Sequence, residues 1–277
     1  MKKLIVTADD FGADVAVNEA VEIAHRTGIL TAASLMVGSP GAADAVRRAR
    51  TMPALGVGLH LVLVEGRPSL PPADVAGLVD GAGNFRTNMV RAGIDMFFSP
   101  RARRQLAAEI EAQFAAFAAT GLTLDHVNAH KHFHLHPTIA GLIGRIGARY
   151  GMTAVRAPVE PRAVLAAAEP SAALASDWVT APWAKRVAHR FRRSGMRVPD
   201  AVFGLAWSGA MTTTRLRGLV ANLPEGLSEI YFHPATRDDY LGHGPAYRHR
   251  DELAALVDPQ VRATIAAAGI SLERFRP

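Results

Sequence analysis

Histidines are concentrated in residues 125–137, which read DHVNAHKHFHLHP and contain five of the 11 histidines of the chain. Imidazole is the commonest protein ligand of metal ions, and the chain has no cysteine to supply thiolates. In an extended segment residues two apart share a face, so His126, Asn128 and His130 would point the same way. The stretch therefore predicts a metal site, with a surface loop of hydrated or helix-capping histidines as the alternative.

Two adjacent carboxylates follow the first apolar run of the sequence. Residues 4–8, LIVTA, are typical of a short buried strand, and Asp9 and Asp10 come directly after it. Because neighbouring strand residues face opposite sides, one acid could bind an ion while the other accepts a proton. The alternative is that Asp9 or Asp10 caps the helix expected to begin near Asp14, but a cap accounts for one acid and not for two.

A third apolar run, residues 55–61 (LGVGLHL), carries His60 near its end. A single histidine on such a strand is ordinarily a hydrogen-bonded core residue. Three strand ends that each deliver Asp or His, however, fit a site of mixed carboxylate and imidazole ligands with an open position for water.

The strand-like runs that would carry these residues alternate with helical stretches, which predicts a parallel sheet. We expect about seven strands, near residues 3–8, 31–37, 56–62, 123–130, 153–157, 201–206 and 228–233. Helices are expected at 14–27, 42–50, 101–120 and 137–150, with a helix or connecting arm at 163–175. Since the candidate ligands follow strands, we expect an α/β fold that is a distorted, TIM-like (β/α) barrel, although an open doubly wound sheet would place them similarly.

Length and composition favour one large domain, residues 1–277, because 49% of the residues are hydrophobic and no change in composition divides the chain. Residues 65–100 form the longest stretch without a firm element. This stretch follows His60 closely, so we expect a lid or binding loop over the site, or else an insertion that only stabilises the fold.

The first residues do not resemble a signal peptide, and no run reaches transmembrane length. The absence of cysteine permits a cytoplasmic location. The formal charge is +6, and basic residues gather between Lys185 and Arg197. This cluster is either a solvated helix face or a peripheral contact with anionic membrane lipids. No recognised nucleic-acid-binding motif accompanies it, so nucleic acid is not an expected partner.

Three motifs resemble the YdjC-type carbohydrate deacetylases: TADDFG at 7–12 with Asn18, GLHL at 58–61, and HKHFH at 130–134. The resemblance extends over most of the chain. Within that family, residues 30–36, 53–60 and the turn at 66–68 most resemble the hopanoid-biosynthesis-associated deacetylases of the HpnK type. Membership implies a distorted barrel that hydrolyses the N-acetyl group of an amino sugar with one divalent metal ion.

The resemblance also implies the metal ligands. Asp10, His60 and His130 would bind the ion, with His132 and His134 as alternatives to His130. Two histidines and a carboxylate suit Zn²⁺, which we favour, while completion of the shell by water would admit Mg²⁺ or Mn²⁺.

Three further residues acquire roles by resemblance. Asp9 would be the general base, and Arg156, in the segment VRAP, would orient that base unless it forms only a surface salt bridge. His233, in the segment YFHP, would be the general acid, which requires it to titrate near neutrality. These roles suit amide hydrolysis, which needs an activated water and a proton for the departing amine.

We therefore expect a metal-dependent N-deacetylase of an N-acetylglucosamine-type sugar carried on a glycosylated hopanoid lipid, with Met96–Phe98 sheltering the lipid. A free chitooligosaccharide is the alternative substrate. A serine hydrolase would need a Gly-x-Ser-x-Gly elbow, which the sequence lacks. A metal-dependent phosphoester hydrolase and a non-catalytic metal- or sugar-binding protein are the rival functions, and the sequence does not specify an oligomeric state.

Overall fold

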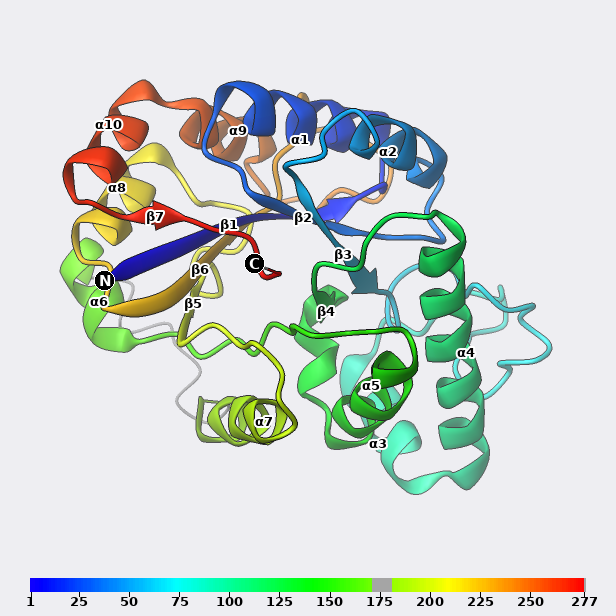
Figure 1. Ribbon diagram of the computed structural model, residues 1–277. Coiled ribbons are helices and arrows are strands. Elements are labelled where there is room, and N and C mark those ends of the chain that lie inside the picture. Colours follow the sequence, from blue (N-terminus) through cyan, green and yellow to red (C-terminus); the bar gives the residue numbers. More distant parts are fainter. Residues whose placement is uncertain (171–180, 277) are drawn as a thin grey trace.

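A single parallel sheet forms the centre of the computed structural model, which describes residues 1–170 and 181–276 (Figure 1). The strand order is β4-β3-β2-β1-β6-β5, with β7 beside β1. Within the described residues the strands are β1 (Lys2–Phe11), β2 (Ala32–Leu35), β3 (Gly56–Leu61), β4 (Val127–Ala129), β5 (Ala201–Phe203), β6 (Gly226–Phe232) and β7 (Ser271–Leu272). The sheet curls into a partial barrel, which confirms the expected distorted (β/α) barrel.

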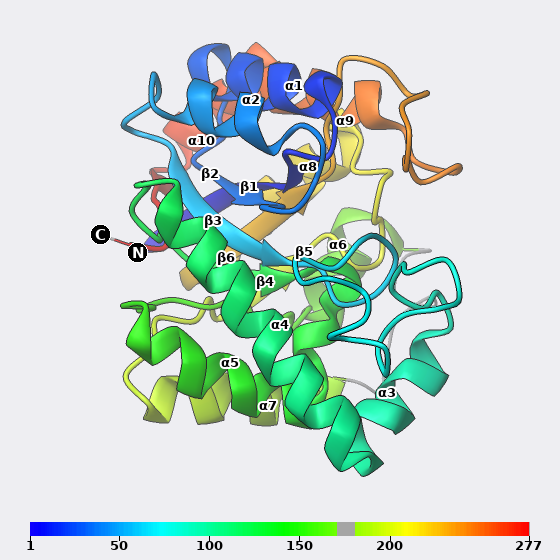
Figure 2. The same cartoon turned by 90° about the vertical axis from the view of Figure 1, so that its right-hand side faces the viewer.

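Helices surround the curled sheet (Figures 1 and 2). They are α1 (Val15–Thr27), α2 (Ala42–Ala49), α3 (Met89–Phe98), α4 (Pro100–Ala119), the 3₁₀ turn η1 (His130–Leu135), α5 (Pro137–Arg149), α6 (Arg162–Ala168), α7 (Ala181–Arg193), α8 (Thr213–Ala221), α9 (His249–Val257) and α10 (Pro259–Ala267). The four expected helices are confirmed within one or two residues. Of the expected arm at 163–175, residues 171–175 lie outside the described residues.

Local signals explain where α1 begins and ends. The Asp14 side chain accepts a hydrogen bond from the Ala16 amide, which caps the helix. At the other end the Gly28 amide donates to the Ala24 carbonyl oxygen. Asp14 therefore takes the capping role that we had considered for Asp9 or Asp10.

The barrel wall is irregular between β4 and β5, where we expected a regular strand at 153–157. The Val127 amide donates to the Ala154 carbonyl, and the Arg156 amide donates back to the Val127 carbonyl, at 3.1 and 3.0 Å. Pro158 then interrupts the hydrogen-bonding pattern, and only isolated bridges form. The segment thus occupies a strand position without forming a strand, and it places Arg156 inside the barrel.

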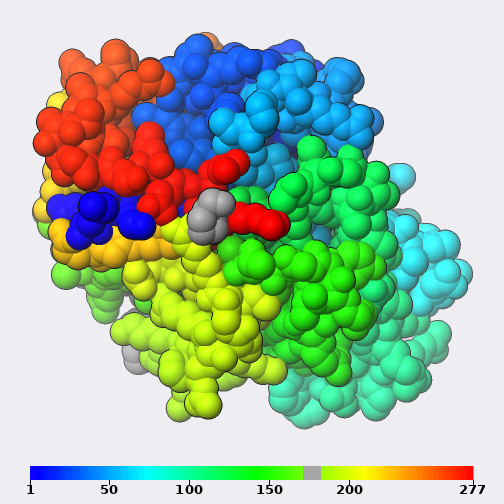
Figure 3. All heavy atoms as spheres, in the orientation of Figure 1, coloured from blue at the N-terminus to red at the C-terminus, as the bar shows by residue number. Residues whose placement is uncertain are grey.

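The end of the barrel where the strands begin is covered by the C-terminal tail, which Figure 3 shows lying beside the N-terminus. Phe275 is fully buried and stacks on the His126 ring at a centroid distance of 4.1 Å. The Arg276 amide donates to the Asp125 carboxylate at 2.9 Å. His126 is therefore part of the barrel floor, although it points inward like Asn128, because both side chains bond the Ser34 hydroxyl.

Residues 65–100 pack closely against α4. The buried Glu109 carboxylate accepts hydrogen bonds from the Ser69 and Leu70 amides at 2.8 and 3.0 Å. Val75 and Phe85 are buried in the core of this segment. Among the described residues, no helix combines the length and apolar content needed to cross a membrane.

The tail supplies a test of how the barrel floor is stabilised. Phe275→Ala should lower the free energy of unfolding by about 3–5 kcal/mol, because it removes a fully buried ring and leaves a cavity beside His126. Leu272→Ala, at a side chain that is 39% exposed in β7, is the matched control and should cost much less. Equal losses in urea denaturation would show that the tail does not stabilise the floor.

Candidate metal and catalytic site

The carboxyl ends of β1, β3 and β4 converge at the opposite end of the barrel. There, Asp9, His60, His130 and His233 line one cavity of about 210 Å³. Met89, the first residue of α3, also lines this cavity.

Asp10, His60 and His130 form a compact group in which one potential ligand atom of each lies within 4.8 Å of the others. The Asp10 Oδ1 atom lies 3.3 Å from His60 Nε2 and 3.2 Å from His130 Nδ1. The structure therefore brings together the three residues that the resemblance assigns to the metal.

A β-bulge explains how two adjacent acids serve the same site. The pairing of β1 with β2 shifts between Ala8 and Phe11, and Asp10 has a left-handed φ of 61°. Strict alternation is broken, and both carboxylates approach His60, with Asp9 Oδ1 at 4.0 Å from Nδ1. The expectation that the two acids simply face opposite sides is wrong for this reason.

Asn128 fixes the tautomer of His60. The Asn128 side-chain amide donates to Asp9 Oδ1 at 3.0 Å, so its carbonyl oxygen is the atom that faces His60 Nδ1 at 2.7 Å. A carbonyl oxygen only accepts, so Nδ1 carries a proton, and in the neutral form of the ring Nε2 is the nitrogen that presents a lone pair. That buried Nε2 has no hydrogen-bond partner and faces the Asp10 carboxylate.

Two electron-pair donors that face each other in a buried site fit a shared cation. The pKa of Asp10 is well below its usual value: burial would raise it, but His130 above all, with His60 and His233, lowers it. Burial would lower the pKa of His130, but Asp10 raises it to about 9, so a proton on this imidazole supplies positive charge in the ion-free chain. Asp10, His60 and His130 thus have the donor types and orientation to hold a divalent ion.

The other histidines of the run are placed differently. His132 Nε2 shares a hydrogen bond of 2.8 Å with the Tyr231 hydroxyl. His134 is fully buried with neither ring nitrogen bonded, and burial lowers its pKa to about 3. Only His130 joins Asp10 and His60 in the group found among the described residues.

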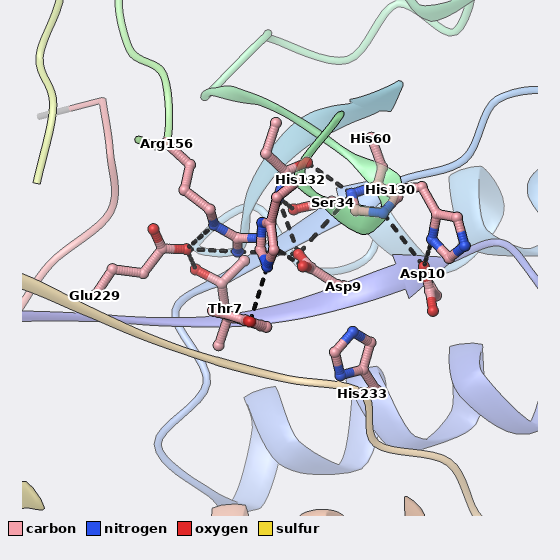
Figure 4. Close-up of polar contacts among 12 residues, drawn as sticks. Thr7, Asp9, Asp10, Ser34, His60, His130, His132, Arg156, Glu229 and His233 are labelled. Carbon is pink, nitrogen blue, oxygen red and sulfur yellow. Dashed lines mark hydrogen bonds and ion pairs between the residues drawn. The ribbon is translucent and has the colours of Figure 1, made fainter. Parts of the chain in front are cut away.

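Arg156 lies behind Asp9 and is fully buried, so it does not form the surface salt bridge that we considered (Figure 4). Its guanidinium donates to both oxygens of the Asp9 carboxylate, with Nη2 at 3.0 Å from Oδ1. Burial would raise the pKa of Asp9, but the arginine charge holds it far below its usual range. Asp9 is therefore ionised at any physiological pH.

Glu229 on β6 completes this network and was not among our predicted site residues. Its Oε1 atom accepts from Arg156 Nε at 2.9 Å and from the Thr7 hydroxyl at 2.8 Å. The sequence did contain a signal for Glu229, since it is the one acid in the otherwise apolar run EIYF. A carboxylate in a buried strand requires a buried cation as its partner.

His233 lies across the site from His60 and follows β6 directly (Figure 4). The Glu252 carboxylate accepts a hydrogen bond from its amide, and His249 Nδ1 bonds its carbonyl oxygen. Burial lowers the pKa of His233 to about 4, although Asp10 and Asp9 oppose this shift. Our expectation of titration near neutrality is therefore wrong for the ion-free chain, in which this imidazole is neutral at pH 7.

Comparisons with known proteins agree with this geometry. Over 275 residues, 98% of this chain and 96% of the relative, the sequence is 32% identical to a carbohydrate deacetylase of Geobacillus stearothermophilus. A human carbohydrate deacetylase is 28% identical over 98% of this chain and 89% of its own length. A solved Enterococcus faecalis V583 structure, named for cellobiose-phosphate cleavage, superposes with a TM-score of 0.78 at 26% identity, covering 99% of this chain and 97% of its own.

The family model described as "YdjC-like protein" matches residues 3–267, which include every site residue described above. With that match over nearly the whole sequence, and a relative that is 32% identical over 96% of its length, the chain belongs to the family of YdjC-like proteins.

Proposed function

We propose that the chain is a metal-dependent N-deacetylase that hydrolyses the acetamide of an N-acetylglucosamine-type sugar. One observation carries the metal dependence: Asn128 orients His60 so that its free Nε2 lone pair faces the Asp10 carboxylate. The names of the relatives from Geobacillus stearothermophilus and human support the carbohydrate deacetylase activity. The hydroxyls of Ser208 and Tyr247 line the same cavity and are polar groups of the kind that orient a ligand.

Asp10, His60 and His130 would hold the ion, and the bound cation would polarise the acetyl oxygen and acidify a water molecule. Two imidazoles and one carboxylate favour Zn²⁺, with Mg²⁺ or Mn²⁺ as the alternatives. These three residues would leave the remaining coordination positions free for water and substrate.

Asp9 would take the proton of the attacking water. Its Oδ1 atom accepts from both Asn128 and Arg156, whereas Oδ2 accepts only from Arg156. An ionised carboxylate oxygen with one hydrogen bond retains a lone pair for a proton. Arg156 would orient this base, and Glu229 would in turn fix the position of Arg156.

His233 would protonate the departing amine nitrogen. It lines the same cavity as Asp9 and has a free Nδ1 atom. Because its pKa is about 4 in the ion-free chain, His233 must gain its proton within the catalytic cycle and not carry it in the resting state.

We further propose that the sugar is attached to a lipid of the hopanoid type, with a free chitooligosaccharide as the alternative substrate. The exposed apolar residues of α3 favour the lipid-linked substrate, because this helix begins at the cavity wall with Met89. The proposed enzyme works in the cytoplasm as one domain with peripheral access to a membrane.

The decisive experiment measures acetate release from an N-acetylglucosaminyl lipid and from a chitooligosaccharide. Purified protein should release acetate in stoichiometric amount with the free amine, and a chelator should abolish the reaction until Zn²⁺ is restored. No release from any N-acetylated sugar would leave a non-catalytic metal- or sugar-binding protein, and release of phosphate from a phosphoester would indicate a phosphoester hydrolase. A higher kcat/KM for the free sugar would reject the lipid substrate alone.

Substitution of the two adjacent aspartates by asparagine should separate metal binding from base catalysis. Asp10→Asn, like His60→Ala and His130→Ala, should lower the metal content measured by elemental analysis. Asp9→Asn should retain metal and lose turnover, although the loss of its charge beside buried Arg156 will also reduce stability. Full metal content in both His60→Ala and His130→Ala would reject this ligand set.

His233→Asn should lower kcat by about 10²–10⁴, the usual contribution of a general acid, and should keep its metal. In the metal-free wild type, the His233 resonance should titrate near pH 4, because burial disfavours its charged form. His189→Asn, at an exposed histidine of α7, is the control. An unchanged rate in His233→Asn would make His233 a structural residue only.

A further inference from the structure

One face of α3 is apolar and exposed. Val90, Ile94, Phe97 and Phe98 are between 45% and 74% exposed, whereas Ala92, Gly93 and Met96 on the other face are buried. The four exposed residues occupy positions i, i+4, i+7 and i+8, which lie on one side of a helix. Single exposed apolar residues are common, but a contiguous set of this kind marks an interaction surface.

A basic groove of about 710 Å³ begins at Phe97 and runs between α4, α5 and α7. Four exposed arginines line it: Arg103, Arg104, Arg145 and Arg190. Among the described residues, none of these guanidinium groups makes an ion pair, and no acidic side chain lines the groove. The groove thus presents uncompensated positive charge beside an apolar helix.

The elements of this surface lie together and next to the site. In Figures 1 and 2, α3, α5 and α7 share one side of the molecule. Figure 2 also shows α3 on the side toward which the strands point, where the candidate site lies. Met89 at the start of α3 lines the site cavity, while Phe97 near its other end lines the groove.

We propose that the exposed face of α3 and the arginine groove together dock the protein on an anionic phospholipid bilayer. The apolar side chains would enter the boundary between headgroups and acyl chains, and the arginines would bind lipid phosphates. Neither element alone would suffice, since an interfacial helix binds most strongly when apolar burial and electrostatic attraction act together. The use of this surface to collect a lipid-carried sugar rests on the proposed function.

Charge complementarity selects the bilayer over a second copy of this chain. A two-fold dimer through this face would juxtapose two identical surfaces and bring the arginines of one groove close to those of the other. Within the described residues α5 and α7 contain no aspartate or glutamate, and the acids of α3 and α4 are already engaged: Asp95 pairs with Arg86, Glu111 pairs with Arg149, and Glu109 is buried. An anionic lipid surface supplies the missing countercharge.

The test is co-sedimentation with vesicles of phosphatidylcholine, with and without 30% phosphatidylglycerol. The unmodified chain should bind the anionic vesicles and lose at least tenfold in affinity when salt is raised from 0.1 to 1 M, because salt screens the arginine contribution. Val90→Ser/Phe98→Ser and Arg145→Glu/Arg190→Glu should each lose at least tenfold as well.

Control variants carry changes of the same kind at other surfaces. Ile23→Ser on α1 removes an exposed apolar side chain, and Arg217→Glu/Arg250→Glu on α8 and α9 reverses two exposed charges. Both controls should bind like the unmodified chain. Equal binding by the α3 or groove variants, or no vesicle binding at all, would overturn the proposal.

Two additional measurements keep the outcomes distinct. Sedimentation velocity tests the alternative that a second copy of the chain covers this face. If the unmodified chain is a dimer, and Val90→Ser/Phe98→Ser converts it to a monomer without loss of vesicle binding, the face is an interface between copies and the docking proposal is overturned. Acetate release from a water-soluble N-acetylated sugar should be the same in all these variants. Variants that lose vesicle binding but release acetate normally would support docking without bearing on the proposed deacetylase function. Failure of the unmodified chain to release acetate would contradict the proposed function and leave the docking proposal standing.

Discussion

The buried ion pairs of Arg156 with Asp9 and Glu229 organise the whole site. All three side chains are at most 3% exposed, so each charge depends on the others for compensation. Removing one partner of such a buried group costs about 3–5 kcal/mol, because the remaining charge is left without compensation. The network joins three parts of the barrel wall: β1, β6 and the irregular segment after β4.

The consequences of this network extend to the proposed metal ligands. Arg156 keeps Asp9 ionised, and an ionised Asp9 can only accept hydrogen bonds from Asn128. Asn128 must then present its carbonyl oxygen to His60, which sets the tautomer of that imidazole. A second carboxylate, Asp10, is turned toward His60 by a bulge and a left-handed backbone, a conformation that costs about 1–3 kcal/mol. Strain and buried charge are therefore concentrated where the proposed chemistry takes place.

The sequence predicted most of this arrangement because parallel strands place their carboxyl ends at one edge of a barrel. Asp10 follows one apolar run, His60 lies near the end of another and His130 ends a third expected strand, so a common edge could be inferred for them without coordinates. The choice of His130 over His132 and His134 came only from the family resemblance. Glu229 was missed because its role depends on a partner 73 residues away in the chain. The neutrality of His233 was missed as well, since burial and not residue type determines its pKa.

Formal charge explains why a divalent cation suits the proposed site better than protons do. Asp9, Asp10 and Glu229 are three carboxylates, and Arg156 supplies one compensating positive charge, so two negative charges remain. A proton on His130 balances only one of them in the ion-free chain. A divalent ion that displaces this proton would balance both, and metal uptake would then be coupled to proton release from His130. The same exchange would leave the donor atom of each of the three ligands without a proton, which is the state in which they could bind the ion.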